Sequence, residues 1–94
     1  MNRRKVLELI ELGESLNVEF KQRFSTHEKI AKSLIAFANT SGGYLLIGVD
    51  DDRSIYGILS EKSDTELIRE TAEKYCVPPV NCNIYSYEIE NKEV

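Results

Sequence analysis

The chain has 94 residues, of which 41% are hydrophobic and 30% are charged, and its formal net charge is −4. These values are typical of one small globular domain and exclude a strongly basic nucleic-acid binder, so phosphate contacts would have to come from a local group of basic side chains. No apolar run approaches the roughly 20 residues of a membrane-spanning helix. The two cysteines, Cys76 and Cys82, have no partners at metal-site spacing, and we expect free thiols in a cytoplasmic protein without membrane contact.

The N-terminal part of the chain predicts a helix followed by a strand. Apolar residues recur among charged ones over residues 2–12, which is typical of an amphipathic helix, and Gly13 is its expected end. Residues 18–24 alternate between apolar and charged side chains, as in a strand with one buried face. The second face of that strand should therefore present charges.

The centre of the chain predicts a helix between two strands. Ser25 and Glu28 form the Ser-x-x-Glu pattern of a capping box, so a helix should start there, and the glycines of residues 39–43 should end it. The continuous apolar run 44–49 indicates a strand that is covered on both faces. A tight polar turn then leads back into a strand over residues 55–58, so the sheet cannot be wholly parallel.

The C-terminal part predicts one more helix and a last strand. A second Ser-x-x-Glu pattern precedes the expected helix 64–75, which Pro78 and Pro79 end. Residues 80–89 are rich in strand-forming side chains, and the chain then turns toward a hairpin partner that has barely begun at Val94. We expect the whole chain to be a single domain, truncated at its C-terminal strand, of a longer protein. Its predicted fold class is α/β (α+β), with a mixed sheet of about four strands and two to three helices.

Several acidic side chains are expected near one end of this sheet. Glu14 precedes the first predicted strand, Glu19 lies on its polar face, and Asp50 to Asp52 follow the central strand. If the two strands are neighbours, Glu14, Glu19 and Asp50 converge as candidate catalytic groups, and together with Asp51 they are candidate ligands of Mg²⁺ or Mn²⁺. A bound metal of this kind can activate water and stabilise a scissile phosphate. The alternative is a solvated turn with surface glutamates.

A second set of side chains is basic. Two lie on the first strand and two on the helix that follows it: Lys21, Arg23, Lys29 and Lys32. Such a group can contact the backbone phosphates of a nucleic acid. Acidic residues lie among them, so an ordinary mixed-charge surface is the alternative. The chain contains no Gly-Lys-Ser/Thr and hence no P-loop, so the sequence gives no support for ATP, and no cofactor is expected unless the domain is a nuclease.

Three blocks of residues carry a family resemblance. They are Glu-Ser-Leu-Asn-Val-Glu-Phe-Lys at residues 14–21, Ala-Phe-Ala-Asn-Thr-Ser-Gly-Gly-Tyr-Leu-Leu-Ile-Gly-Val-Asp-Asp at residues 36–51, and Ile-Tyr-Gly-Ile at residues 55–58. In this order they resemble the Schlafen AlbA-type domain, a DNA-binding domain formerly described as a divergent AAA domain. The resemblance implies an Alba-like α/β fold at the N-terminus of a bacterial or archaeal transcriptional regulator.

The resemblance also implies a function, which we compare with two alternatives. In the animal Schlafen proteins the domain is tied to metal-dependent cleavage of structured RNA, and the site residues there correspond to Glu14, Glu19 and Asp50 or Asp51. We predict a DNA-binding domain of a transcriptional regulator that contacts nucleic acid through its basic set. A metal-dependent endoribonuclease acting on structured RNA is the first alternative. A homodimerisation module that uses the unpaired edge strand is the second.

Overall fold

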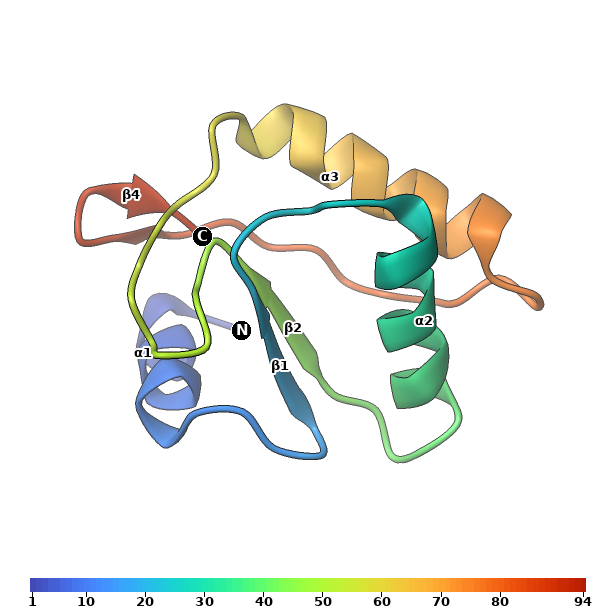
Figure 1. Cartoon of the computed structure of the whole chain (residues 1–94), viewed down its shortest axis with the longest axis horizontal. Coiled ribbons are helices and arrows are strands. Elements are labelled where there is room, and N and C mark those ends of the chain that lie inside the picture. The colour runs from blue at the N-terminus through green and yellow to red at the C-terminus, as the bar shows by residue number, and fades with distance from the viewer.

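Three helices surround a short pair of strands in the computed structural model, which describes residues 1–94 (Figure 1). The elements in chain order are α1 (Arg3–Leu12), β1 (Val18–Lys21), α2 (His27–Ala38), β2 (Tyr44–Ile47), α3 (Glu61–Glu70), the π-helical turn η1 (Thr71–Tyr75), β3 (Glu88–Ile89) and β4 (Lys92–Glu93). The predicted α/β class is confirmed. None of these helices combines the length and the apolar character that a bilayer crossing requires.

The parallel pair of β1 and β2 is the centre of the fold. Val18 lies opposite Tyr44 and Lys21 lies opposite Ile47, and α2 is the crossover between the two strands. In Figure 1, α1 packs on one side of this pair and α2 on the other. Only a short loop joins the end of β1 to the start of α2, so the end of β1 and the first turn of α2 belong to one part of the molecule.

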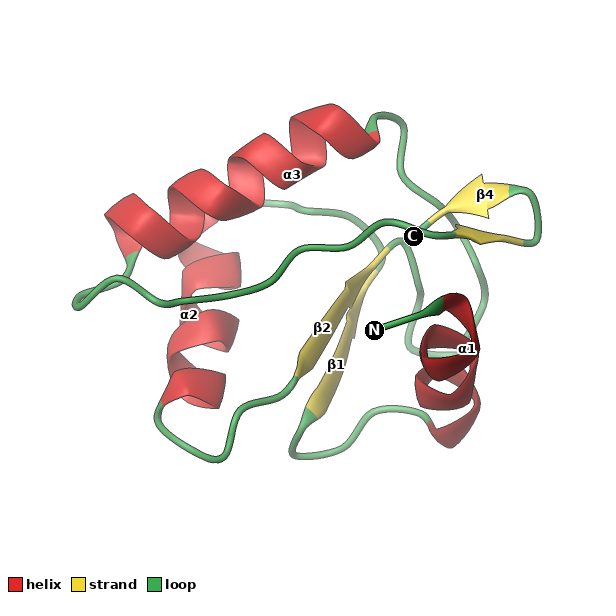
Figure 2. Cartoon of the chain, turned by 180° about the vertical axis from the view of Figure 1, so that it is seen from behind, coloured by secondary structure: helices red, strands yellow, loops and turns green.

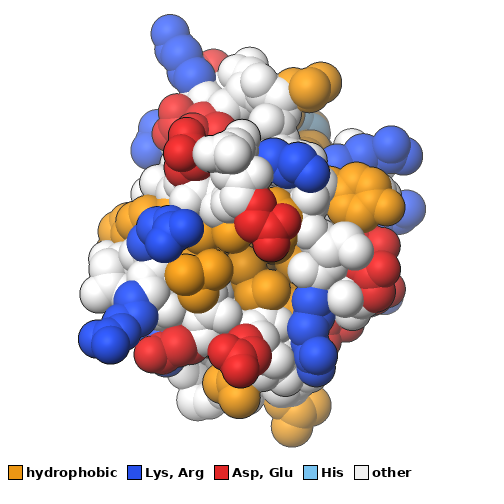
Figure 3. Space-filling view, turned by 90° about the vertical axis from the view of Figure 1, so that its left-hand side faces the viewer, with side chains coloured by type: hydrophobic (Ala, Val, Ile, Leu, Met, Phe, Trp, Pro, Cys, Tyr) orange, Lys and Arg blue, Asp and Glu red, His pale blue; other side chains and the backbone are white.

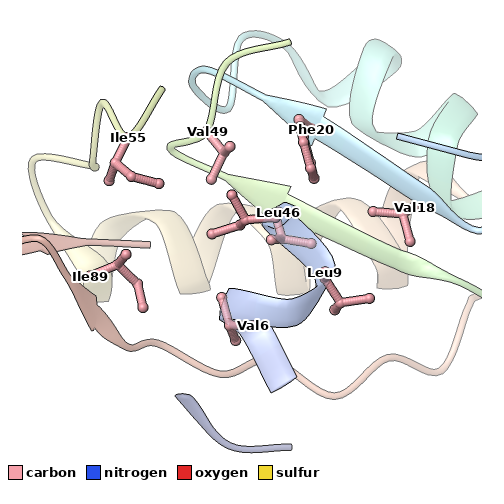
Figure 4. Close-up of a cluster of buried hydrophobic side chains, with 9 residues drawn as sticks. Val6, Leu9, Val18, Phe20, Leu46, Val49, Ile55 and Ile89 are labelled. Carbon is pink, nitrogen blue, oxygen red and sulfur yellow. The ribbon is translucent and has the colours of Figure 1, made fainter. Parts of the chain in front are cut away.

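Two clusters of buried apolar side chains cover the two faces of the strand pair. The first joins α1 to β1, β2 and β3 (Figure 4) and consists of Val6, Leu9, Ile10, Val18, Phe20, Leu46, Val49, Ile55 and Ile89. The second joins α2 to β2 and η1 and consists of Phe24, Ile30, Ala31, Leu34, Ile47, Ala72 and Cys76. Leu46 and Ile47 are neighbours on β2 and belong to different clusters, because successive side chains of a strand point to opposite faces. The prediction that this strand is covered on both faces is confirmed.

The predicted single mixed sheet is instead two separate strand pairs, the parallel β1–β2 and the antiparallel β3–β4. β2 ends early because the next residue, Gly48, has a φ of 101°, which takes the chain out of the extended conformation. The predicted strand 55–58 is reduced to a single bridge, since Gly57 has a φ of 75°. The Ile58 N–H still donates to the Glu93 carbonyl at 2.9 Å, so this segment connects β2 with the C-terminal hairpin.

The predicted strand 80–89 is also shorter than expected, because only its last two residues form β3. The chain then reverses through Glu90 and Asn91, whose φ angles of 52° and 62° are those of a two-residue hairpin turn, and β4 pairs back onto β3. Residues 81–86 have no backbone hydrogen-bond partner, which is why they are not part of a strand.

The ends of three elements differ from the prediction by a few residues. Thr26, not Ser25, caps α2: its hydroxyl oxygen accepts from the Lys29 N–H at 3.2 Å, whereas Ser25 has a φ of 65°. α3 begins directly after its own cap, Ser60, and therefore earlier than predicted. β1 ends at Lys21, where the chain bends toward α2. Both cysteines are free thiols, as predicted.

Candidate functional site

β1 presents two charged side chains, Glu19 and Lys21, toward α2. Buried and half-buried residues alternate along the strand, and these two are the half-buried ones. The Glu19 Oε2 accepts a hydrogen bond from the Ser33 hydroxyl of α2 at 2.9 Å and lies 3.2 Å from the Lys21 Nζ. The Glu19 and Lys21 side chains are 33% and 28% exposed, so the ion pair is accessible to solvent and to a ligand.

The basic residues of the predicted set do not all lie together. Lys29 is one turn before Ser33 on the same face of α2, and its carbonyl oxygen is 3.4 Å from the Ser33 hydroxyl. Lys32 instead lines a shallow depression on the side of α2 that faces η1. Arg23 is exposed in the loop between β1 and α2. The structure therefore places Lys21 and Lys29 near Ser33, leaves Arg23 exposed in the loop between their elements, and directs Lys32 to another side of α2.

The charges around this site are unbalanced in favour of positive ones. Lys21, Arg23 and Lys29 are accompanied by one acidic side chain, Glu19, whereas Glu28 and Lys32 line the depression that faces η1. This leaves an excess of two positive charges at the site in a chain of net charge −4. The side of the molecule that carries α1 is different. Figure 3 shows Lys/Arg and Asp/Glu side chains interspersed around an apolar centre on that side. The junction of β1 and α2 is therefore the better candidate site for an anionic ligand.

Glu14, predicted as a catalytic residue and a metal ligand, is bound to the backbone of β1. Its Oε1 accepts a hydrogen bond from the Phe20 N–H at 2.8 Å, and the Ser15 carbonyl accepts from the Val18 N–H at 3.4 Å. β1 has a neighbouring strand on one side only, so the loop before β1 provides acceptors along its other edge. Because Phe20 is 3% exposed, an N–H group without an acceptor would be costly there. Glu14 has a structural role that needs no ligand.

This structural role predicts a difference between two substitutions of Glu14. Glu14→Ala removes the acceptor of the Phe20 N–H and should lower the free energy of unfolding by about 1–3 kcal/mol. Glu14→Gln keeps an oxygen acceptor at the same place and should retain most of that stability. Urea unfolding of both variants measures the difference. Equal losses in the two variants would show that the hydrogen bond is not the reason for the effect.

In the acidic turn after β2, several polar groups form hydrogen bonds with one another. The Asp50 N–H donates to the Ser54 carbonyl at 2.9 Å, and the Asp52 Oδ1 accepts from the Ser54 N–H at 2.8 Å. Hydrogen bonds from the side chain and the backbone of Ser54 lower the pKa of the Asp52 carboxyl from its ordinary value. No group of three or more His, Cys, Asp or Glu side chains is arranged to hold a metal ion. The catalytic role of Glu14, Glu19 and Asp50 stays a prediction, and so does the metal-ligand role of these three residues and Asp51.

His27, in the first turn of α2, joins this helix to the end of α3. Its Nδ1 lies 2.7 Å from the Thr71 hydroxyl oxygen, its Nε2 lies 3.7 Å from a Glu70 carboxylate oxygen, and its ring stacks on Tyr75 at 4.2 Å between centroids. The Thr71 hydroxyl donates to the Leu67 carbonyl at 2.8 Å, so it accepts from the imidazole. These contacts fix the start of α2, which carries the basic residues. Nothing in the sequence indicates them, because Thr71 is 44 residues further along the chain.

Residues 14–94 match the family model described as Schlafen, AlbA_2. The chain belongs to this family. It is also 33% identical over 87 residues to the "Uncharacterized ATP-binding protein UU034" of Ureaplasma parvum serovar 3 (strain ATCC 700970), an alignment that covers 86% of this chain and 24% of that protein. The chain thus spans about a quarter of the length of this relative. No solved structure matches it.

The AlbA_2 match begins at Glu14, so it includes β1, α2 and β2 together with every predicted site residue, and it leaves α1 outside. The resemblance drawn from the three sequence blocks is thereby confirmed. The position of the domain at the N-terminus of a transcriptional regulator stays a prediction.

Proposed function

We propose that this AlbA_2 domain binds nucleic acid, as the DNA-binding part of a transcriptional regulator, through Lys21, Arg23 and Lys29 of the predicted basic set. The observation that carries the proposal is the local excess of two positive charges where β1 meets α2, in a chain of net charge −4. Backbone phosphates are attracted to such a group, and their contacts provide affinity that does not depend on base sequence. Membership of the Schlafen AlbA_2 family supports the proposal.

A phosphate that binds Lys21 has to replace the Glu19 carboxylate in the ion pair between these two residues. Exposed ion pairs contribute only about 0–1 kcal/mol, so a phosphate oxygen can replace the carboxylate at the Lys21 ammonium group at little cost. After this exchange Glu19 keeps the hydrogen bond from the Ser33 hydroxyl, which is 2.9 Å long in the free domain. Glu19 therefore neutralises Lys21 in the free domain and competes with the phosphate for it.

Nucleic acid is a better ligand for this domain than ATP, although the Ureaplasma relative is named as an ATP-binding protein. The glycine turn follows α2, and the negative end of the helix dipole at this place disfavours a phosphate. The large cleft between the helices and β2, of about 890 Å³, contains Glu61 and Asp64 but no Lys or Arg. Neither place offers the positive charge that a triphosphate needs.

Binding to labelled duplex DNA and to a labelled RNA hairpin, measured by fluorescence anisotropy from about 50 to about 200 mM salt, tests the proposal. Three phosphate contacts predict that log K falls with log salt with a slope of about −2 to −3. Lys21→Ala should weaken binding to all sequences alike and reduce the magnitude of that slope by about 1. Binding that does not respond to salt, or no binding to either ligand, would contradict the proposal.

The same ligands, incubated with Mn²⁺ or with EDTA, separate binding from the ribonuclease alternative. Under the binding proposal the nucleic acid stays intact in both conditions. Glu19→Gln should then bind more tightly, because Lys21 loses its competing carboxylate. Cleavage that requires Mn²⁺ and disappears in Glu19→Gln would instead make the domain a nuclease. Glu8→Gln, which removes one negative charge from an exposed position of α1, is the matched control.

A further inference from the structure

Residues 81–86 form a stretch of backbone that is held at both ends and unpaired in between. At one end the Val80 N–H donates to the Ala72 carbonyl at 3.0 Å, and at the other Tyr87 and Val94 exchange two backbone hydrogen bonds of 3.1 and 2.9 Å. None of residues 81–86 makes a hydrogen bond to another backbone group. Figure 2 shows this stretch crossing the back of the molecule with no helix or strand in front of it.

The side chains at the end of the stretch are arranged as in a strand. The rings of Tyr85 and Tyr87 lie 6.4 Å apart with an angle of 24° between their planes, which places them on the same side of the chain. Residues two apart share a side in an extended strand. The exposed Tyr85 lies between the half-buried Ile84 and Ser86, whereas residues 81–83 are all exposed and Tyr87 is half-buried.

The stretch also lacks the charges that usually protect an exposed strand. No charged residue occurs from Tyr75 to Tyr87, in a chain in which 30% of the residues are charged. Proteins commonly place lysine and other charged residues on edge strands, because the unpaired N–H and C=O groups of such a strand otherwise pair with another chain. When the partner segment is identical, the absence of charge also means that no like charges face each other.

We propose that residues 81–85 pair with the same segment of a second copy of this chain, antiparallel and around a two-fold axis at Asn83, so that the two Asn83 residues lie opposite each other. Two identical antiparallel segments are self-complementary, which is the geometry of most homodimers. β2 is also unpaired on one side, but β2 and residues 81–86 line the same cleft of about 890 Å³, which separates them. A second copy therefore supplies the partners that the unpaired backbone groups lack within the chain.

Sedimentation equilibrium of the 94-residue chain, without nucleic acid, tests this pairing. The mass should rise from 10.7 kDa toward twice that value as the concentration increases. Asn83→Lys adds a positive charge at an exposed position in the middle of the segment of each copy and should weaken the dimer at least about tenfold. Ser63→Lys adds the same charge at an exposed position of α3 and should dimerise like the unchanged chain.

A mixture of Asn83→Lys and Asn83→Asp chains should recover the dimer, since opposite charges then face each other. The far-UV circular dichroism spectrum of each variant verifies that it is folded. The proposal is overturned by a mass that stays at 10.7 kDa at all concentrations, or by an Asn83→Lys variant that dimerises as tightly as the unchanged chain. Slow amide hydrogen exchange of residues 81–86 in a monomeric sample would also overturn it, because the segment would then be paired within one chain.

Discussion

Replacing Lys21 and Lys29 together by glutamate is expected to lower the affinity of the domain for duplex DNA by about 100-fold at near-physiological salt. Lys21 forms an ion pair with Glu19, which accepts a hydrogen bond from the Ser33 hydroxyl, and Lys29 lies one helical turn before Ser33 on α2. Each substitution removes a phosphate contact together with its counterion release and adds a carboxylate that repels the phosphate backbone. The salt slope should fall in magnitude by about 2, because two contacts are lost. Fluorescence anisotropy over a range of salt concentrations measures both effects.

A control for this double variant has to change the total charge by the same amount. Arg4→Glu with Lys62→Glu does so on exposed residues of α1 and α3, and both double variants lower the formal net charge from −4 by four units. If the local surface binds DNA, the control should lose only a few-fold in affinity, through the overall field of the protein. Equal losses in the two double variants would mean that total charge, and not the junction of β1 and α2, governs binding. That result would contradict the proposed site.

The parts of the fold that the sequence predicts are those fixed by local patterns. The spacing of apolar residues places α1 and α2, the glycines at 13 and 43 mark where the chain turns, and the run that forms β2 is covered on both faces. The lengths of β2 and of the predicted strand 55–58 are wrong because the backbone conformation of a single glycine decides each of them. Gly48 and Gly57 adopt positive φ angles, and the pattern of side chains carries no information about this choice.

The candidate site, like the fold, is predictable from the sequence only in part. Its residue types and their order along the chain are visible in the sequence, and so is the charged face of β1. Which partner each side chain takes depends on the geometry of the folded chain. Glu14 bonds to the backbone of its own strand, and Glu19 is shared between Ser33 and Lys21, so the carboxylates that appear equivalent in the sequence have separate roles. The contact of His27 with Thr71 spans 44 residues and has no local signature.

The second large effect is expected at the turn between α2 and β2. A Cβ atom on Gly43 would lie 2.5 Å from the Phe37 Cδ1 and 2.7 Å from the Asn17 carbonyl oxygen. That oxygen accepts the Tyr44 N–H at 2.7 Å, at the start of the β1–β2 pair. Phe37 can move its ring, but the Asn17 oxygen belongs to the backbone, so Gly43→Ala has to displace one strand from the other. We expect a loss of about 3 kcal/mol in the free energy of unfolding, measured by urea denaturation.

Gly42→Ala, one residue earlier, separates this crowding from backbone strain. Gly42 has a φ of 91°, and no atom lies within 4 Å of a Cβ built on it, so an alanine there meets strain and no crowding. Its expected cost is about 1 kcal/mol, clearly less than that of Gly43→Ala. If Gly42→Ala is the more damaging variant, the turn is limited by its backbone conformation and not by the close approach of Asn17. The distinction bears on the candidate site, because the contact at Gly43 sets the spacing of β1 and β2, and β1 carries Glu19 and Lys21.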